Sequence, residues 1–307
     1  MKARLLLTGG SGFLGSILTT KLQTLFEVDV LGRSSQSSVI CDLAQEIPLL
    51  PRNYEFVVHA AGKAHVTPKN EREAQDFHNV NVGGTQNLLA SLERLSDLPN
   101  EIVFISSVAV YGLESGHDID ESYPLAGETP YAKSKIQAEA LVEEWGKKNG
   151  LRTTILRLPL LVGPNPPGNL GAMVRAMRNN RYFSIGKASA HKSMVWAEDL
   201  ANHLPASMGK GGIYNLTDGY HPCMKELELS LAKCLSANVH TVPLWLAKVL
   251  AMIGDLVGTR FPLNTCRLNK LICSLTFSDD KARKGLNWNP TPVLEKLSSG
   301  IAGTVKI

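Results

Sequence analysis

A glycine-rich turn between an apolar strand and an amphipathic helix, at residues 2–15, constrains the fold of this chain most. Leu5, Leu6 and Leu7 form a run of the length expected of a buried parallel strand. Apolar residues recur at helical spacing after the turn, as in a dinucleotide-binding βα unit. Glycines there let the backbone approach a pyrophosphate, and the helix N-terminus offers free N–H groups. We therefore predict a Rossmann-type α/β fold with a doubly wound parallel sheet, whose first cofactor contacts are Gly9, Gly12, Phe13, Leu14 and Gly15.

The composition limits which binding partners and which cellular compartment we expect for this protein. The 307 residues contain 32 basic and 28 acidic side chains without a basic run, so we expect no nucleic-acid partner. Five cysteines without a C-x-x-C pair favour free thiols, and the first strand begins too early for a signal peptide. We therefore expect a cytoplasmic protein, with no metal site. The apolar stretch Val242–Val257 contains Lys248 and Asp255, which favours an amphipathic helix on the core or an interface over a membrane span.

The second predicted strand, at residues 28–31, ends without an acid. A site that prefers NAD places a carboxylate at this position, where it binds the ribose 2′-hydroxyl. Here Arg33 and Ser34 follow the strand and could bind a 2′-phosphate through charge-assisted hydrogen bonds. We therefore expect NADP in preference to NAD, although Arg33 could also be a solvated loop residue. Asp42, beside Leu43, could accept a hydrogen bond from the adenine amino group or serve as a turn residue.

The next predicted strand, at residues 56–59, is followed by small side chains that leave room for a cofactor: Ala60, Ala61 and Gly62. Lys63 and His65 come next on a loop, where a histidine is more often structural than catalytic. Residues 70–94 are predicted to form a long helix that contains Asn81 and is interrupted at Gly83 and Gly84.

Ser107, Tyr131 and Lys135 carry the predicted chemistry. Thr129 and Pro130 suit the N-cap and first position of a helix, and their spacing puts Tyr131 and Lys135 on one helix face. A tyrosine can exchange a proton with a sugar oxygen while hydride passes to or from a nicotinamide. Its ordinary pKa of about 10 means that a phenolate at neutral pH needs about 4 kcal/mol, which a cation about 4 Å away can supply. We therefore expect Lys135 to stabilise the phenolate and Ser107 to orient the substrate oxygen.

The order of these motifs resembles the extended short-chain dehydrogenases/reductases, and among them the NAD-dependent epimerase/dehydratase family that acts on nucleotide sugars. The likeness runs nearly end to end, through TGGSGFLG (8–15), VVHAAG (57–62), NVGGTQNLL (81–89), FISSVAVYG (104–112), YAKSK (131–135), LRLPLLVGP (156–164), HKSMVWAEDLA (191–201), YNLTDG (214–219) and DDKARKGLNW (279–288). It implies that Ser107, Tyr131 and Lys135 are the catalytic triad. Further implied cofactor contacts are Asp42, Leu43, Asn81, Tyr131, Lys135 and Leu158. Implied substrate contacts are Lys63, His65, Ser107, Val108, Asn169, Leu170 and Lys192.

The resemblance implies an oxidoreductase that acts at C4 of a nucleotide-linked hexose, with a UDP-linked hexose expected. UDP-glucose 4-epimerases usually carry an acid where this chain has Gly32 and Arg33, and Asn at the position of Leu160. Val162 replaces a tyrosine of the similar branch of surface-polysaccharide enzymes, and Lys192 replaces a more usual arginine. These departures favour a 4-keto-sugar reductase, with a UDP-hexose 4-epimerase as the alternative. A dinucleotide-binding sensor without catalysis is a more remote alternative.

The residue composition changes after residue 163, where closely spaced prolines and glycines predict a loop. We expect a dinucleotide-binding domain over residues 1–163 and a mainly substrate-binding lobe over residues 164–307, with a return to the sheet near residues 212–216. By resemblance, the helices predicted around residues 70–94 and 131–148 pair across a homodimer. Apolar positions that support this expectation are Val80, Leu88, Leu92, Ile136, Ala140 and Leu141.

Overall fold

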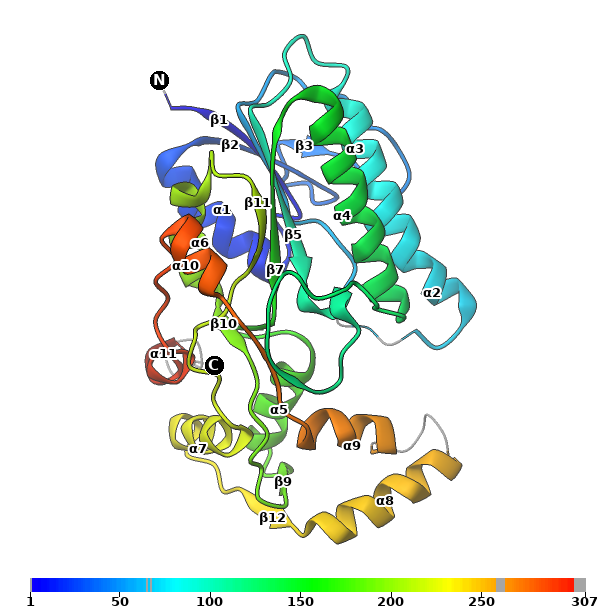
Figure 1. Cartoon of the computed structure of the whole chain (residues 1–307), viewed down its shortest axis with the longest axis vertical. Helices are drawn as coiled ribbons and strands as arrows, with labels where there is room; N and C mark the ends of the chain where they lie inside the picture. Colours follow the sequence, from blue (N-terminus) through cyan, green and yellow to red (C-terminus); the bar gives the residue numbers. More distant parts are fainter. Residues whose placement is uncertain (1, 65, 67, 258–262, 301–307) are drawn as a thin grey trace.

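A parallel sheet of seven strands forms the centre of the molecule (Figure 1). The computed structural model describes residues 2–64, 66, 68–257 and 263–300. The strands lie in the order β11-β7-β5-β4-β1-β2-β3, and each neighbouring pair is parallel. Their bounds are β1 (Arg4–Thr8), β2 (Glu27–Gly32), β3 (Val39–Ile40), β4 (Phe56–His59), β5 (Glu101–Ser107), β7 (Arg152–Leu158) and β11 (Gly212–Asn215). The strand order reverses between β1 and β4, so the predicted Rossmann-type doubly wound sheet is confirmed.

The leucines of β1 place this strand in the middle of the sheet. Leu5, Leu6 and Leu7 are fully buried, as expected of a parallel strand that is covered on both faces. Thr8 at the end of β1 is in register with His59 at the end of β4. The carboxyl ends of the central strands therefore meet at one edge of the sheet, where ligands bind in folds of this type.

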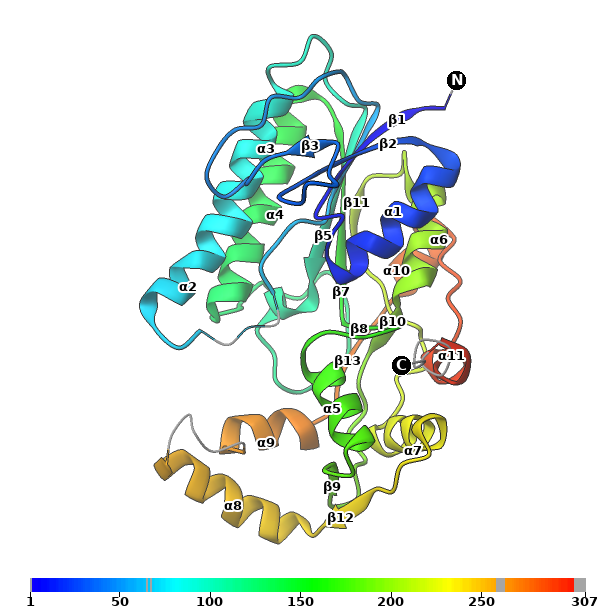
Figure 2. The same ribbon diagram turned by 180° about the vertical axis from the view of Figure 1, so that it is seen from behind.

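Helices cover both faces of the sheet, as the two opposite views show (Figures 1 and 2). One face is covered by α1 (Phe13–Leu25), α6 (Ala197–Ser207) and α10 (Asp280–Leu286), and the other by α2 (Glu71–Phe77), α3 (Gly84–Leu92) and α4 (Pro130–Asn149). Leu18 of α1 and Leu200 of α6 lie in the core on the first face. Leu88 of α3 and Val142 of α4 lie in the core on the second. Each face thus has its own apolar core.

The helix predicted over residues 70–94 is a continuous helical run with a wider turn inside it. Asn70 caps its first turn, because the Asn70 side chain accepts a hydrogen bond from the Glu73 amide at 2.9 Å. A π-helical segment, η1 (His78–Gly83), joins α2 to α3 and contains Asn81. The chain stays helical through Gly83 and Gly84, so the predicted break in the helix at these glycines is wrong. The irregularity is the π turn, which swings Asn81 inward.

Helix α4 begins as the sequence predicts. The Thr129 hydroxyl accepts a hydrogen bond from the Ala132 amide at 3.1 Å, and Pro130 occupies the first helical turn. The helix ends at Gly150, whose φ of +66° suits a residue without a side chain. Tyr131 and Lys135 therefore occupy the first turns of a long helix that is fixed at both ends.

A smaller lobe lies beyond the carboxyl edge of the sheet (Figure 1). Its helices are α5 (Gly168–Arg178), α7 (Met224–Leu235), α8 (Leu244–Val257), α9 (Thr265–Ile272) and α11 (Val293–Gly300). Short parallel pairs connect them: β8 (Leu160–Val162) with β10 (Met194–Trp196), β9 (Phe183–Ile185) with β12 (His240–Val242), and β6 (Gly116–Ile119) with β13 (Leu275–Phe277). In the described ranges no helix is long and apolar enough to cross a membrane. The apolar stretch that the sequence places at 242–257 is largely α8.

Two helices from the expected substrate lobe belong to the layer that covers the sheet. Leu200 and Leu204 of α6 and Leu286 of α10 pack in the same core as the leucines of α1. Strand β11 also returns to the edge of the sheet, where it pairs with β7. The division at residue 163 is therefore too simple, because the chain returns to the sheet layer at α6 and β11 and again at α10.

Candidate active site

The first turn between β1 and α1 is shaped so that only glycine fits at its start. Gly9 has a φ of +76°, and a Cβ there would lie 2.6 Å from the Ala61 main-chain nitrogen. A Cβ at Gly15 would collide with the Gly9 carbonyl. No side chain caps α1, whose N-cap is Gly12, so the N–H groups of its first turn, at Phe13, Leu14 and Gly15, are available to an anion. This geometry fits the pyrophosphate of a dinucleotide.

A buried histidine ties the ends of β1 and β4 together beneath that turn. His59 Nδ1 lies 2.7 Å from the Thr8 hydroxyl, and His59 Nε2 lies 3.0 Å from the Thr85 hydroxyl. The Ala61 amide donates to the Thr8 hydroxyl at 3.1 Å. Burial lowers the pKa of His59 to about 3, so its ring is neutral. These contacts fix Ala60, Ala61 and Gly62 against the glycine turn, a role for His59 that the sequence did not reveal.

Asn81 holds the loop that follows β4. Its side-chain oxygen accepts from the Lys63 amide at 2.7 Å, and its side-chain nitrogen donates to the Lys63 carbonyl at 3.1 Å. The same nitrogen donates to the Ser134 hydroxyl at 2.8 Å, on the first turns of α4. Asn81 thus connects the small-residue loop to the helix that carries Tyr131, which is a structural basis for its predicted place near the cofactor.

Ser107, Tyr131 and Lys135 lie at the same edge of the sheet. Ser107 is the last residue of β5, in register with Leu158 at the end of β7, and Val108 follows it in a short 3-10 turn. The Ser107 hydroxyl lowers the pKa of Tyr131 through a hydrogen bond, although burial dominates and raises that pKa overall. The Phe77 ring packs edge-on against the Tyr131 ring, with centroids 6.1 Å apart. The phenol is therefore protonated at neutral pH.

Lys135 is held beneath the site by the strand. Its ammonium donates to the Ile105 carbonyl at 2.8 Å and lies 4.4 Å from the centroid of the Phe104 ring. Burial lowers the pKa of Lys135 to about 8, and Glu139 opposes that shift. Burial raises the pKa of Tyr131 and the Ser107 contact lowers it, while Lys135 contributes no shift, so the stabilisation of the phenolate by Lys135 stays a prediction.

An ion pair that the sequence did not reveal lies behind the triad. Arg157 of β7 donates to Glu139 of α4 at 2.7 Å, and each side chain is at most 3% exposed. Arg157 also donates to the Tyr111 hydroxyl at 3.0 Å, and Tyr111 donates to Asn215 of β11 at 2.8 Å. The Ser106 hydroxyl donates to Glu139 as well. This network anchors α4 to three strands one turn beyond Lys135.

The end of β2 leaves Arg33 without an acidic neighbour on its own strand. Asp29 accepts two hydrogen bonds from Arg52, at 2.8 and 2.9 Å, and Glu27 also pairs with Arg52. Arg52 and Tyr54 lower the pKa of Asp29 against the effect of burial. Arg33 is exposed and forms no ion pair with a described residue. Both acidic residues of β2, Glu27 and Asp29, are thus paired with Arg52.

Asp42 and Leu43 lie beyond β3, near the predicted adenine site. One oxygen of Asp42 accepts from the Ala44 amide at 3.1 Å, which is the turn role that the sequence left open. The Leu43 side chain is buried, and its carbonyl accepts from Asn87 at 2.8 Å. The adenine contact therefore stays a prediction.

The predicted substrate residues come from both sides of the site. Lys63 pairs with Asp76 at 2.7 Å, and the Lys192 ammonium donates to the Cys273 carbonyl at 2.6 Å. Burial lowers the pKa of Lys192. Asn169 is exposed on the first turn of α5, whereas the Leu170 side chain is 3% exposed in the core of the lobe. Leu170 could therefore reach a ligand only through its main chain. His65 lies outside the described residues.

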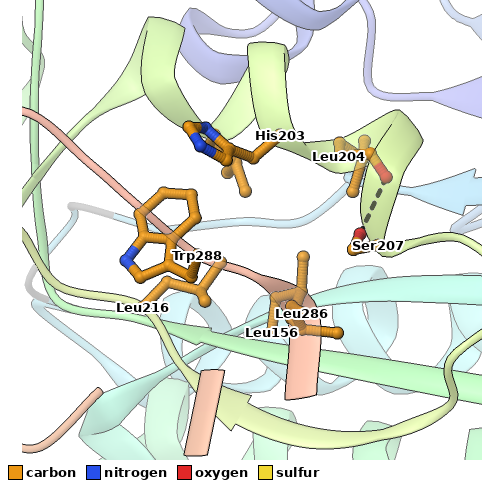
Figure 3. A pocket seen from close by; sticks show the side chains of 8 residues that line it. Leu156, His203, Leu204, Ser207, Leu216, Leu286 and Trp288 are labelled. Atoms are coloured by element: carbon orange, nitrogen blue, oxygen red, sulfur yellow. Dashed lines mark hydrogen bonds between the residues drawn. The ribbon is translucent and has the colours of Figure 1, made fainter. Parts of the chain in front are cut away.

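A small cavity on the far side of the sheet is a packing gap rather than a ligand site. It lies between α6, α10 and the sheet and is lined largely by apolar side chains (Figure 3). Its volume of about 10 Å³ is close to the minimum for one water molecule. The His203 ring packs against Trp288 with centroids 4.9 Å apart, and the Ser207 hydroxyl donates to the Leu204 carbonyl. Among the described residues no cluster of His, Cys, Asp and Glu is placed to hold a metal ion.

The doubly wound sheet, the glycine turn and the Ser-Tyr-Lys group at its edge define a dinucleotide-dependent enzyme of the short-chain dehydrogenase/reductase class. A family model described as "NAD dependent epimerase/dehydratase family" matches residues 5–216. The chain belongs to that family, and it is an NAD(P)-dependent enzyme of the extended short-chain dehydrogenase/reductase type. Its family comprises nucleotide-sugar epimerases and reductases.

Relatives of both kinds align along most of the chain. It is 26% identical over 302 residues to an N-acetyl-alpha-D-glucosaminyl-diphospho-ditrans,octacis-undecaprenol 4-epimerase of Escherichia coli O157:H7, in an alignment that covers 92% of this chain and 89% of the relative. It is 27% identical over 271 residues to a GDP-6-deoxy-D-mannose reductase of Pseudomonas aeruginosa, in an alignment that covers 79% of this chain and 83% of the relative.

Solved structures share the fold. RMD from Pseudomonas aeruginosa, complexed with NADPH, superimposes with a TM-score of 0.76 at 21% identity and covers 99% of both chains. The UDP-glucose 4-epimerase of Thermus thermophilus, in complex with NAD, gives a TM-score of 0.74 at 21% identity and covers 98% of both chains. Proteins of this fold therefore include both an NADPH complex and an NAD complex.

Proposed function

We propose that this protein is a 4-keto-sugar reductase that acts at C4 of a hexose carried on a nucleotide diphosphate. The observations that carry the proposal are the Tyr131 phenol, hydrogen-bonded to Ser107 and able to give a proton to a substrate oxygen, and a β2 strand whose acids are both bound to Arg52. A reductase needs such a proton donor when a carbonyl oxygen becomes a hydroxyl. A bound reduced nicotinamide supplies the hydride.

The chain's own groups have distinct roles in that reaction. Ser107 donates to the substrate oxygen and orients it, and Tyr131 transfers its proton to that oxygen. The Lys135 ammonium, held on the Ile105 carbonyl, favours the phenolate that Tyr131 becomes. The Phe77 ring packs against the Tyr131 ring and shields that side of the phenol from water.

NADP is proposed as the cofactor, in preference to NAD. Glu27 and Asp29 are bound to Arg52, so no free carboxylate of β2 would bind a ribose hydroxyl or repel a phosphate. Arg33 is exposed at the carboxyl end of the strand, with a guanidinium that suits phosphate geometry. A charge-assisted hydrogen bond is worth about 1.5–3 kcal/mol, so Arg33→Ala should weaken NADPH binding roughly 10–100-fold. NADH binding should change little, and equal weakening of both would contradict the assignment.

A diphosphate is the proposed anchor of the substrate. Lys192 and Asn169 come from opposite segments of the lobe, and Lys192 brings a charge into a partly buried place. The names of the two relatives share a hexose on a diphosphate, carried by guanosine in one and by undecaprenol in the other. A UDP-linked hexose of surface-polysaccharide synthesis in the cytoplasm is the form proposed for this chain.

A 4-epimerase is the second candidate, favoured by the relative from Escherichia coli O157:H7 that aligns with 92% of this chain. An epimerase uses the same triad twice, once to remove and once to return the hydride. It therefore retains its nicotinamide, whereas a reductase exchanges it after each turnover.

One experiment separates the candidates. Purified protein is first assayed for bound nicotinamide, and then incubated with UDP-, dTDP- and GDP-linked hexoses and their 4-keto derivatives. Each is tested with NAD, NADH, NADP and NADPH, and the products are identified by NMR. Consumption of NADPH in step with a reduced C4 supports the reductase. Interconversion of C4 epimers without net consumption indicates the epimerase, and cofactor binding without turnover of any sugar indicates a sensor.

A homodimer formed by α2, α3 and α4 is also proposed. Val80, Ala140 and Leu141 keep some exposure and support a contact there. Leu88 and Leu92 are wholly buried in the chain's own core, so the expectation that they face a partner is wrong. Light scattering at micromolar concentration should give about twice the chain mass of 33.3 kDa.

A further inference from the structure

Helix α8 is apolar on its outer face as well as its inner face. Its inner face packs on α9 through Ala247 and Ala251, which are buried with Leu268. Its outer side chains are exposed: Trp245 at 67%, Val249 at 43%, Met252 at 60%, Ile253 at 42% and Leu256 at 89%. At 3.6 residues per turn these five lie within an arc of about 100°. They form one continuous stripe, called here the α8 outer face.

The α8 outer face points away from the rest of the molecule. Both views place α8 at the end of the chain's long axis opposite the sheet, with α9 on its inner side (Figures 1 and 2). No described element packs on it. A surface helix normally carries polar residues on its outer face, so an outer stripe this apolar marks a surface that binds something.

Positive charge borders this face. Lys248 lies on α8 beside the stripe, and Lys187 follows β9 next to the start of the helix, where a Cβ at Gly186 would lie 3.2 Å from Leu244. Both lysines are exposed, and neither pairs with an acid among the described residues. The acid of α8, Asp255, accepts from the Thr265 amide at 3.1 Å and from its hydroxyl. The Thr265 contacts lower the pKa of Asp255, so its carboxylate stays charged, and Lys187, Lys248 and Asp255 together leave a net charge of +1 beside the stripe.

An anionic bilayer surface matches this combination better than a second copy of the chain. An interfacial helix buries an apolar face at the boundary of the acyl chains, while lysines at its edge contact anionic headgroups. A second copy would instead present the same apolar stripe with the same net positive border, so the two borders would not be complementary in charge. At 1.5 Å per residue the 14 residues of α8 extend about 21 Å, less than the roughly 30 Å of a hydrocarbon core, so the helix lies along the surface.

We propose that α8 docks this protein on anionic membrane surfaces, with Trp245, Met252 and Leu256 inserted among the lipids. The docked lobe is the one that carries Lys192, whose ammonium binds the Cys273 carbonyl at the end of α9. The inference goes beyond the proposed function and does not depend on which sugar the enzyme takes.

The chain contains its own probe for the test. Of its four tryptophans, Trp245 is exposed, whereas Trp145, Trp196 and Trp288 are at most 6% exposed. The full chain is mixed with vesicles of phosphatidylcholine and phosphatidylglycerol, and separately with vesicles of phosphatidylcholine alone. Sedimentation with the anionic vesicles is expected, together with a blue shift of tryptophan emission and quenching by brominated acyl chains. Raised salt should weaken the binding.

Matched variants locate the surface. Met252→Glu/Leu256→Glu should lower vesicle affinity about tenfold or more, since each removes an inserted apolar side chain. Lys187→Glu/Lys248→Glu should lower it about fivefold or more and remove most of the salt dependence. Leu49→Glu is the control, because Leu49 is 85% exposed on a loop remote from α8.

Three results would overturn the proposal. The first is that the wild-type chain does not sediment with anionic vesicles, and the second is that the α8 double variant sediments as well as the wild type. The third is that the α8 double variant converts a self-associated chain to monomer in sedimentation velocity while vesicles have no effect, which would make the α8 outer face a contact between copies. None of these results depends on catalytic activity, so failure of the reductase proposal would be seen separately.

Discussion

Glu139→Gln tests the buried ion pair that holds the catalytic helix. The substitution keeps the shape of the side chain and removes its charge, so the buried Arg157 guanidinium is left with neutral partners alone, the amide oxygen of the new glutamine and the Tyr111 hydroxyl. Breaking a buried pair from one side costs about 3–5 kcal/mol, because a charge remains without compensation. We therefore expect a loss of this size in the free energy of unfolding, measured by urea denaturation.

The double variant Glu139→Leu/Arg157→Met separates the effect of the unpaired charge from the value of the pair. An apolar replacement of a buried pair is often neutral or stabilising, so the double variant should regain most of the loss. The cycle formed with the single variants Glu139→Leu and Arg157→Met gives the coupling between the two side chains. A loss below about 1 kcal/mol for Glu139→Gln would refute the reasoning.

Catalysis supplies a second readout for the same variant. Glu139 raises the pKa of Lys135 against burial, and the net value is about 8. Without the carboxylate that pKa falls further, so Lys135 loses its charge at a lower pH. The alkaline limb of the pH–rate profile of Glu139→Gln should therefore move to lower pH, whereas a purely structural loss would leave the limb in place.

Three further predictions concern the site itself. Tyr131→Phe should lower turnover about 10²–10⁴-fold with cofactor affinity unchanged, as measured by steady-state kinetics and NADPH titration, and activity within tenfold of wild type would contradict its role. Gly9→Ala should lower the free energy of unfolding in urea by at least about 1–2 kcal/mol and weaken NADPH binding, because the φ of Gly9 is +76° and the new Cβ would clash with the Ala61 backbone. Gly83→Ala is the control, expected to be neutral or stabilising, because nothing lies within 4 Å of a Cβ at that position. The pKa of Lys135 is lowered from 10.5 to about 8, so the unfolded chain binds more protons between these values and the lysine's contribution to stability should rise with pH across that window. Lys135→Met should remove that rise in urea unfolding at pH 8 and pH 10, and an unchanged slope would contradict the assignment.

The parts of the fold that depend on neighbouring residues could be predicted from the sequence. The run Leu5–Leu7 followed by glycines fixes a strand, a turn and a helix within a few residues, and the structure has all three. Thr129 and Pro130 likewise start α4 because a cap acts only on the next turn. Parallel strands then bring Ser107 and Leu158 to one edge, which is why the candidate site could be assembled without coordinates.

The parts of the site that depend on contacts between residues far apart in the sequence could not be predicted. Asn81 sits in a π turn because its side chain bonds both Lys63 and Ser134, contacts that no helical spacing encodes. Glu139 and Arg157 meet only once α4 has packed across the sheet, and each alone reads as an ordinary surface charge. The pKa of Tyr131 also escaped prediction, because the argument from Lys135 did not include the burial of the phenol.

The role in substrate binding proposed for Lys192 would couple the substrate to the position of α9 through this one side chain. Lys192 already donates to the Cys273 carbonyl, where α9 ends. An ammonium has three donors, so Lys192 can keep that carbonyl while it also donates to a diphosphate, but a planar arginine fork in the same place would have to divide its geometry between them. A bound diphosphate favours the charged form of Lys192 against the burial that lowers its pKa. In the proposed complex, the charge of the substrate and the contact of Lys192 with the end of α9 should therefore stabilise each other.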